Sequence, residues 1–388
     1  MVVLRGVVTS LNFTVGTSLV RSNDMANNIN AIITMIMSFR MNYSKKLLLF
    51  NLNFVFRGAL AVIRGFGDYM GSGTVIVTGG AGFIGSATCE LLREIYDVII
   101  VDNLYSGSID NIKHLLRLDN VKFVKMDVTD HDEFLRKLKP LIKDVSGIIH
   151  LASIVNIDEV NANPRRALEV NVLGTINVLE FMRRFDINRV VYASSVAVYG
   201  EPEYLPIDEN HPLRPRNLYG LTKLMCEQIL WRYYEDYGIK FIALRYFNVY
   251  GPRMRQGQYG SVIYKFIVSL LKGETPIIYG DGNQTRDFIY VYDVAEANMK
   301  ALDSDYVGAL NIGTGREVSI NELYNTLCRL LGKYVKPKRE PPRIGDVRRS
   351  RANIEKAKKI LKWKPKVDLL TGLRYTINFY ERVISKKA

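Results

Sequence analysis

The sequence predicts an α/β fold in which helices cover both faces of a parallel sheet and a smaller lobe follows. Short apolar segments alternate with helical stretches through the middle of the chain. A glycine-rich loop joins the first such segment to a helix, and polar residues stand where several segments end. Alternation of this kind gives a parallel sheet buried on both faces, and such sheets bind ligands at the carboxyl ends of their strands.

Length and composition describe an ordinary globular protein. The 388 residues are enough for one large or two modest domains, and 48% of them are hydrophobic and 24% charged. The three cysteines, Cys89, Cys226 and Cys328, are far apart and form no CxxC or Cys/His cluster. We therefore expect no disulfide framework, no metal site and a cytoplasmic location.

The net charge of +14 has three interpretations: a solvated basic surface, nucleic-acid binding, or an anionic small substrate. Basic residues are scattered, with local density in residues 333–351 and 356–366. Aromatic residues do not alternate with them in the manner of a nucleic-acid module. We favour the solvated surface, expect no nucleic-acid partner, and leave room for a phosphate-bearing substrate.

Residues 1–70 differ in composition from the rest of the chain. They are rich in asparagine and contain only two acidic residues. Their apolar runs, 31–39 and 47–56, fall short of the roughly 18–20 residues of a membrane helix, so we expect no membrane span. An interfacial anchor, a folded extension and a disordered extension remain open. We favour a start of translation at Met70, because a strand and a nucleotide loop begin directly after it.

The first strand, Val75–Val77, runs into the loop Thr78-Gly79-Gly80-Ala81-Gly82-Phe83-Ile84-Gly85, and a helix continues to about Arg93. Glycines allow a tight turn and a close approach of phosphate to the backbone. The start of the helix offers free N–H groups and the positive end of its dipole to a pyrophosphate. The position of the loop between a strand and a helix makes this glycine pattern specific.

The second strand, Val98–Val101, ends at Asp102. A carboxylate at this point accepts hydrogen bonds from both ribose hydroxyls of an adenosine and repels a 2′-phosphate, which favours NAD over NADP. Asp102 as a mere turn former is the alternative.

The alternation continues beyond Asp102. Strands are predicted at Val121–Lys125, Gly147–His150 and Arg189–Ala193, with helices at His131–Leu138 and Pro164–Arg184. Asp127 and Leu151 follow the third and fourth strands, so both stand at the ligand-binding edge of the sheet. The sequence predicts a Rossmann-type, doubly wound fold.

Tyr219 and Lys223 open a helix that continues to about Tyr237. Residues four apart on a helix share a face, and an ammonium beside a phenol lowers the phenol pKa from about 10 toward neutrality. The phenolate can then take a proton from a sugar hydroxyl as the carbon gives up hydride. Alone, Tyr-x-x-x-Lys is a frequent accident. The glycine loop and the upstream Ser194-Ser195 make it a specific signal.

Residues 71–388 resemble the extended short-chain dehydrogenase/reductase family, of the NAD-dependent epimerase/dehydratase type, and within it the UDP-glucose 4-epimerases. The motifs that carry the resemblance are TGGAGFIG at 78–85, Asp102-Asn103, Asp127-Val128, HLAS at 150–153, Asn171 in VNVLGT, SSVAVYG at 194–200, YGLTK at 219–223, RYFNVYGPR at 245–253, GDGNQTRDFIYVYDV at 280–294 and RIGD at 343–346. Together they are specific for the family and less so for the substrate.

The resemblance implies a role for each matching residue. Ser195 would hydrogen-bond the reacting sugar oxygen, Tyr219 would act as acid and base, and Lys223 would hold the nicotinamide ribose. Asn248, Arg286, Arg343 and Asp346 would hold the nucleotide diphosphate and the uridine ribose, although Arg286 and Arg343 could instead be surface charges. The implied NAD-binding residues are Gly79, Gly82, Phe83, Ile84, Gly85, Asp102, Asn103, Ser106, Gly107, Asp127, Val128, Leu151, Ala152, Ser153, Asn171, Tyr219, Lys223 and Phe247.

The expected organisation is a Rossmann domain at 71–251 and a smaller, discontinuous substrate-binding lobe at 252–388, whose chain returns to the first domain at about 286–301. The resemblance also implies a homodimer built from the helices near 164–184 and 217–237.

The predicted reaction is NAD-dependent epimerisation at C4 of a UDP-hexose, UDP-glucose or UDP-galactose, through a transient 4-keto sugar. A nucleotide-sugar 4,6-dehydratase or decarboxylase is the nearest alternative. It is disfavoured because Val196 and Ala197 stand where those relatives have acidic residues. A non-catalytic NAD-binding regulatory protein is an alternative of another class, and such proteins usually lose the catalytic pair.

Overall fold

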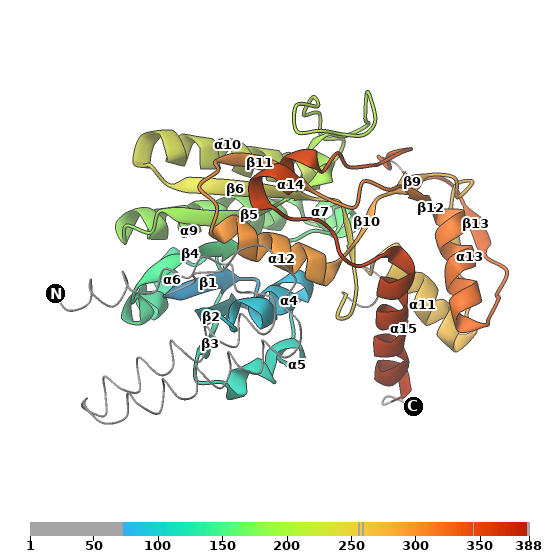
Figure 1. Ribbon diagram of the computed structural model, residues 1–388, viewed down its shortest axis with the longest axis horizontal. Helices are drawn as coiled ribbons and strands as arrows, with labels where there is room; N and C mark the ends of the chain where they lie inside the picture. Colours follow the sequence, from blue (N-terminus) through green and yellow to red (C-terminus); the bar gives the residue numbers. More distant parts are fainter. Residues whose placement is uncertain (1–72, 255–256, 258–259, 344, 386–388) are drawn as a thin grey trace, which may run out of the picture. The chain divides into compact units, whose positions relative to one another are not determined.

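A parallel sheet forms the centre of the protein (Figure 1). The computed structural model describes residues 73–254, 257, 260–343 and 345–385, so the interpretations of residues 1–70 lie outside the described residues. In this part of the chain seven strands pair in the order β11-β6-β5-β4-β1-β2-β3. They are β1 Thr74–Thr78, β2 Asp97–Asp102, β3 Val121–Lys125, β4 Val145–His150, β5 Arg189–Ser195, β6 Lys240–Tyr246 and β11 Gly308–Ile312.

The strand order reverses beside β1, which lies between β2 and β4. Chain crossovers leave in opposite directions on the two sides of such a point, so a crevice opens there at the carboxyl ends of the strands. All five residues of β1 are buried, as the apolar sequence TVIVT requires in a strand covered on both faces. The predicted Rossmann-type sheet is confirmed.

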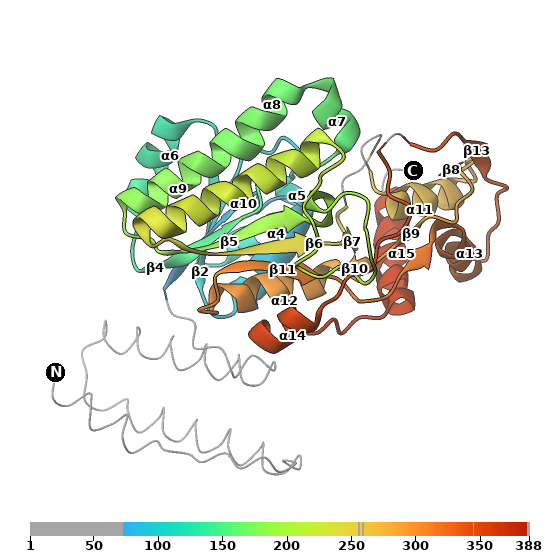
Figure 2. The same ribbon diagram turned by 90° about the horizontal axis from the view of Figure 1, so that it is seen from above.

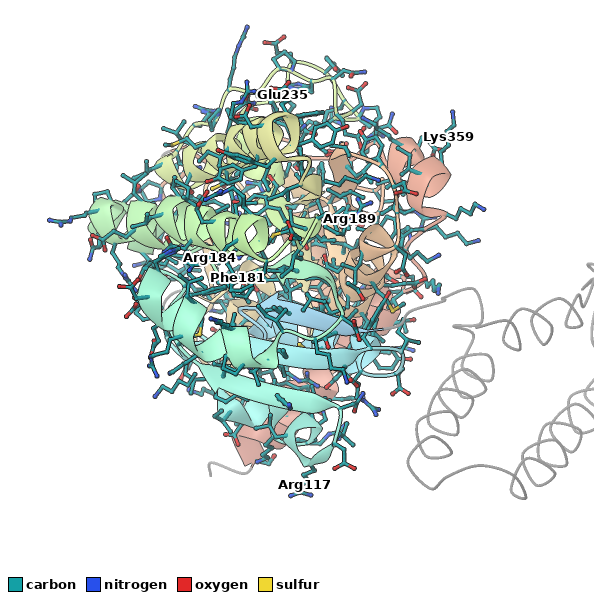
Figure 3. All side chains as sticks on the ribbon, turned by 90° about the vertical axis from the view of Figure 1, so that its left-hand side faces the viewer. Arg117, Phe181, Arg184, Arg189, Glu235 and Lys359 are labelled. Carbon is teal, nitrogen blue, oxygen red and sulfur yellow. The ribbon has the colours of Figure 1, made fainter. Side chains whose placement is uncertain are left out.

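Helices cover both faces of the sheet (Figure 2). One face packs against α6 His131–Leu138, α9 Gly174–Arg184 and α10 Leu218–Tyr237. Phe181 of α9, labelled in Figure 3, is fully buried there and meets Phe134 of α6 edge to face at 5.1 Å. The other face carries α4 Phe83–Leu92 and α12 Val291–Leu302, which pack on each other. The shorter elements α5 Ile109–Ile112, η2 Leu115–Arg117, η3 Lys139–Leu141 and α7 Ile157–Ala162 lie in the connections.

The stretch predicted as one helix, Pro164–Arg184, contains a wider π-helical turn. It divides into α8 Pro164–Leu168, the π-helix η4 Glu169–Leu173 and α9. The carbonyl oxygen of Asn171 in η4 accepts hydrogen bonds from the Thr175 hydroxyl and from the thiol of Cys226 on α10. These bonds occupy a backbone acceptor of the turn, and π-helical turns are frequent at functional sites.

A second, smaller core lies beyond the sheet, at the right of Figure 1. Its buried side chains come from several helices and a short pair of strands, and they form a cluster of their own. The elements are α11 Val262–Lys272, β8 Ile277–Tyr279, β9 Thr285–Arg286, β12 Val318–Ser319, α13 Ile320–Leu331, β13 Lys338–Glu340 and α15 Leu369–Ser385.

The return of the chain to the first domain extends further than the predicted 286–301. β10 Phe288–Tyr290 pairs with β7 Asn248–Tyr250, α12 packs on α4, and β11 then completes the edge of the main sheet as far as Ile312. A second return occurs later in the chain, because α14 Glu355–Leu361 packs against β11 and α12. The short strand β11 lies far along the chain and was not recognised from its sequence.

No helix within the described residues is both long enough and apolar enough to cross a bilayer.

Candidate active site

A cavity of about 470 Å³ opens at the carboxyl ends of β1 to β6. Most of the sequence-predicted cofactor and catalytic residues line it, together with residues of the smaller lobe. The predicted residues present are Gly79, Gly82, Phe83, Ile84, Gly85, Asp102, Asn103, Ser106, Asp127, Val128, Leu151, Ala152, Ser153, Ser195, Tyr219, Lys223, Phe247 and Arg343.

The glycine loop forms a close-packed turn before α4. Gly79 has a φ of +69°, and a Cβ on Gly85 would lie 2.1 Å from the carbonyl oxygen of Gly79. Only glycine fits at these two positions. No side chain caps the start of α4 at Gly82, so the first N–H groups of the helix face the cavity without a side-chain acceptor. This is the arrangement that binds a pyrophosphate.

Asp102 ends β2 at the same edge, with 8% of its surface exposed. Its Oδ2 accepts a hydrogen bond from the Ala81 N–H at 3.0 Å, and its Oδ1 accepts one from Leu104 N–H at 2.7 Å. Burial raises the carboxyl pKa and these two hydrogen bonds oppose that shift. The carboxylate is held against the glycine loop, where it can accept a ribose hydroxyl.

The end of β3 carries a polar cluster. Asp127 Oδ2 accepts hydrogen bonds from Asn103 at 2.9 Å and from Arg166 at 2.5 Å. Arg166, on α8, also lines the cavity, and it was not among the predicted site residues. Its only signal was its place two residues after Pro164 at a predicted helix start. Asp127 and Arg166 thus lie side by side at the cavity rim.

Two predicted cofactor residues do not line the cavity. Asn171 is 1% exposed, and its side chain is fully used: Oδ1 accepts from the Ser153 hydroxyl and Ile154 N–H, while Nδ2 donates to the Ile154 carbonyl and Thr222. Asn171 therefore stabilises the loop after β4 without lining the cavity. Gly107 packs on the backbone of Ala81, where a Cβ would lie 2.9 Å from the carbonyl carbon.

Ser195, Tyr219 and Lys223 converge on the cavity from β5 and α10. Asn217 caps α10 by accepting a hydrogen bond from Gly220 N–H. A Cβ on Gly220 would lie 2.5 Å from the Ala197 carbonyl oxygen, so glycine allows the helix start to approach the end of β5. The side chain of Ser195 lies close enough to Tyr219 to favour its phenolate form.

The electrostatics of this group differ from the expectation. Although Tyr219 is only partly buried, desolvation raises its pKa to about 12, and the Ser195 side chain only partly opposes this. The pKa therefore does not fall toward neutrality, although the Lys223 ammonium lies 5.9 Å from the ring centre. Burial lowers the pKa of Lys223 to about 8. In the protein alone, the proton stays on the phenol.

A second cavity, of about 250 Å³, adjoins the first and shares with it Val249, Gly260, Ser261, Val262 and Arg343. The remaining predicted substrate residues, Asn248, Arg286 and Asp346, line this one.

The charges of the second cavity are only partly compensated. Arg286 is paired with Asp346. The guanidinium of Arg343 lies over the Tyr279 ring, 4.2 Å from its centre. Lys265 of α11, which the sequence analysis missed, is half-buried there, and burial and the charge of Arg343 lower its pKa. The buried Oδ1 of Asn248 accepts no hydrogen bond within the described residues. A cation-rich pocket with a free buried acceptor suits an anionic ligand that carries N–H or O–H donors.

No cluster of side chains suited to hold a metal ion exists among the described residues.

The comparison with protein families decides the class. Residues 75–313 match the NAD dependent epimerase/dehydratase family. The chain belongs to this family. It is therefore an enzyme of the nucleotide-sugar epimerase/dehydratase type, of the extended short-chain dehydrogenase/reductase group, and its cofactor is NAD. The glycine loop and Asp102 fit this cofactor, because an uncapped helix start faces the cavity beside a ribose-binding carboxylate.

Related proteins differ in their named activities. A relative from Methanocaldococcus jannaschii, named "Putative UDP-glucose 4-epimerase", is 46% identical over 307 residues, which cover 79% of this chain and 97% of the relative. UDP-glucuronic acid decarboxylase 6 of Arabidopsis thaliana is 35% identical over 77% of this chain and 86% of its own length. The structure of a UDP-N-acetylglucosamine 4-epimerase from Methanobrevibacter ruminantium, in complex with UDP-N-acetylmuramic acid, matches with a TM-score of 0.76 and 36% identity, over 81% of this chain and 100% of that one.

Proposed function

We propose that the protein interconverts the C4 epimers of a UDP-hexose, with UDP-glucose and UDP-galactose as the expected pair. The observation that carries this proposal is the joining of two cavities. One contains the dinucleotide loop and the predicted catalytic residues, and the other contains the arginine and asparagine side chains that suit a nucleotide diphosphate. The sugar between them would lie beside Tyr219.

Each side chain has a task in this reaction. Ser195 hydrogen-bonds the sugar O4, and Tyr219 takes the proton from O4 and later returns it. Lys223 holds the nicotinamide ribose, and its positive charge favours the phenolate. NAD, when bound, supplies the nicotinamide that accepts the C4 hydride and gives it back, and its positive charge adds to that of Lys223. The need for both charges agrees with the raised pKa of Tyr219 in the protein alone.

The grip on the diphosphate explains how the configuration inverts. A 4-keto sugar must turn so that its opposite face receives the hydride. The Arg286–Asp346 pair lies in the second cavity, and Arg343 lies where the two cavities adjoin. They can hold the diphosphate while the hexose rotates, so the intermediate is not lost to solvent.

The distribution of carboxylates favours epimerisation over dehydration. Among the described residues that line the first cavity, the carboxylates are Asp102 and Asp127, and both lie at the ends of β2 and β3 with the cofactor residues. Elimination of the 6-hydroxyl needs a proton donor beside the hexose. Val196 and Ala197, in η5 Val196–Val198, offer none.

Incubation of the full-length protein and NAD with separate UDP-sugars tests this proposal. UDP-glucose should give UDP-galactose with no net reduction of NAD. A 4-keto-6-deoxy product would instead support a dehydratase, and a pentose from UDP-glucuronic acid would support a decarboxylase. Turnover of UDP-N-acetylglucosamine alone would keep the epimerase chemistry and change the sugar.

We also propose a homodimer formed through α8, α9 and α10. Apolar side chains are exposed along this stretch: Leu173 of η4 is 44% exposed, and Leu221 and Met225, four residues apart on α10, are 42% and 37% exposed. Exposed apolar patches of this kind mark protein interfaces.

A further inference from the structure

Glu227 of α10 and Arg245 of β6 form a buried ion pair outside the cavities. Their residues are 3% and 4% exposed. Arg245 donates from Nε to Oε1 at 3.0 Å and from Nη2 to Oε2 at 2.6 Å, a two-pronged geometry. A buried ion pair seldom stabilises a fold more than apolar side chains of the same size would. Its presence therefore needs another explanation.

The contacts of the pair surround Ser195. The Ser194 hydroxyl donates a 2.5 Å hydrogen bond to Glu227 Oε1. Arg245 donates from Nη1 to the Tyr199 hydroxyl at 2.9 Å, and its guanidinium lies 4.9 Å from the centre of that ring. Ser194, directly before Ser195, and Tyr199, four residues after it, are thus both hydrogen-bonded to the same ion pair.

Glu227 also lies on the catalytic helix. It follows Lys223 by four residues and Tyr219 by eight, so the three lie along one face of α10. The bond from Ser194 to Glu227 consequently joins the strand end that carries Ser195 to the helix that carries the other two residues.

The pair sets the charge around Lys223 as well. The titratable groups that face this lysine are His150 on β4, Tyr192 on β5, and Tyr219, Cys226 and Glu227 on α10. Burial holds His150 neutral by lowering its pKa to about 3, and burial raises the pKa of Tyr192, Tyr219 and Cys226. Cys226 and Glu227 both favour the ammonium form of Lys223 against desolvation, and Glu227 is the carboxylate among these groups.

We propose that Glu227 and Arg245 are positioning residues for the reaction: they hold Ser195 at a set distance from Tyr219, and Glu227 keeps Lys223 charged. The inference rests on the proposed roles of these three residues. The ion pair is kept for the geometry and charge of the site, at a cost to the stability of the fold.

Glu227→Gln tests the proposal, since it keeps the shape of the side chain and removes its charge. We expect kcat to fall ~10–100-fold, with KM for the UDP-sugar and the NAD content unchanged. Lys223 loses a neighbouring anion and faces the uncompensated charge of Arg245. The basic limb of the kcat–pH profile should therefore move to lower pH. An unmoved limb would overturn the proposal.

The double variant Glu227→Gln/Arg245→Met separates positioning from stability. Removal of both charges should restore much of the thermal stability lost in the single variant. It should not restore kcat, because Ser194 and Tyr199 still lack their charged partners. Recovery of kcat together with stability would show a merely structural role.

Asp293→Asn is the matched control. This buried carboxylate on α12 accepts hydrogen bonds from the N–H groups of Lys366 and Val367, so loss of its charge should lower stability and leave the kcat–pH profile unchanged.

The effect of Glu227 on the charge of Lys223 can be measured without a sugar substrate. NMR of isotope-labelled lysine side chains, with Lys223 assigned through Lys223→Met, measures its pKa directly. Glu227→Gln should lower that pKa, and an unchanged value would contradict the proposal even if the wild-type protein epimerised no UDP-hexose. Failure of the wild-type protein to act on UDP-sugars would count against the proposed function instead.

Discussion

The ammonium group of Lys223 donates a 2.7 Å hydrogen bond to the carbonyl oxygen of Ala193. Ala193 stands two residues before Ser195 on β5, so this bond also ties α10 to the catalytic strand. The lysine is thereby held beside the rings of Tyr192 and Tyr219, 4.9 Å and 5.9 Å from their centres. Its charge can act on Tyr219 through space.

Tyr219→Phe should lower kcat by about 10²–10⁴-fold, the usual contribution of a positioned acid and base. NAD should remain bound, because the phenyl ring still fills its place in the cavity. Steady-state kinetics and the NAD content of the purified variant measure the two effects. Tyr246→Phe is the control, since this residue also lines the cavity and its hydroxyl donates to Asn298 of α12. Near-normal epimerisation by Tyr219→Phe would refute the assignment.

Lys223→Met should stabilise the fold at neutral pH. A lysine titrates near 10.5 when exposed, and burial lowers the pKa of Lys223 to about 8. Between these values the unfolded chain binds more protons than the folded one, so stability rises with pH across this window, and the full cost is present below pH 8. The cost is on the order of 3–4 kcal/mol.

Thermal unfolding measured at several pH values tests this expectation. The variant should unfold at a higher temperature than the wild type at pH 7, and the gap should close between pH 8 and 10.5. Lys272→Met, which changes an exposed lysine of α11, should show no such gap at any pH. A gap of constant size would show that lost contacts, and not the charge, set the difference.

The elements of the first half could be predicted because local pattern and long-range structure agree there. The predicted range Val121–Lys125 coincides with β3, and His131–Leu138 coincides with α6, because each has a clear period and a clear end. β11 could not be found in this way. Its five residues resemble any short apolar run, and only pairing with β6 identifies them as the sheet edge.

The motif residues of the site could be located from sequence, but their contacts could not. Asn171 lies within a family motif and was assigned to the cofactor, yet its four hydrogen bonds all go to protein groups. Arg166 and Lys265 carry no local pattern that distinguishes them from other basic residues on helices. Their burial beside Asp127 and Arg343 arises only from tertiary packing.

Asp102→Asn should weaken the preference for NAD over NADP by about tenfold or more, which corresponds to 1.4 kcal/mol or more. The neutral amide loses the charge that repels a 2′-phosphate, and it must turn an N–H₂ group toward either Ala81 N–H or Leu104 N–H. Calorimetric titration of cofactor-free protein with each dinucleotide measures the ratio. Asp119→Asn, an exposed change before β3, should leave the ratio unaltered. If Asp102→Asn left the ratio of the NAD and NADP affinities unchanged, Asp102 would only stabilise the turn and would not select the cofactor.

Met225→Glu should convert a dimer into a monomer. Met225 is 37% exposed on the apolar face of α10, and two glutamates brought together across a symmetric interface would be desolvated and repel each other. Light scattering after gel filtration reads the mass. Tyr334→Glu alters a more exposed side chain on the smaller lobe, 68% exposed, and should keep the dimer. A monomeric wild-type protein would contradict the proposed dimer interface.

Arg343→Gln should weaken the binding of UDP ~10–100-fold and that of uridine little. Within the described residues no ion pair involves Arg343, whereas Arg286 is compensated by Asp346, so the charge of Arg343 is available to a diphosphate. Charge-assisted hydrogen bonds to phosphate are stronger than neutral ones.

Arg343→Lys should recover only part of the affinity for UDP, since an ammonium cannot make the forked contact or stack flat on Tyr279. Calorimetry of the NAD-loaded protein with UDP and with uridine separates the two contributions. Arg339→Gln, an exposed change on β13, is the control. Equal losses for both ligands would mean that Arg343 supports the nucleoside through Tyr279 and not the diphosphate.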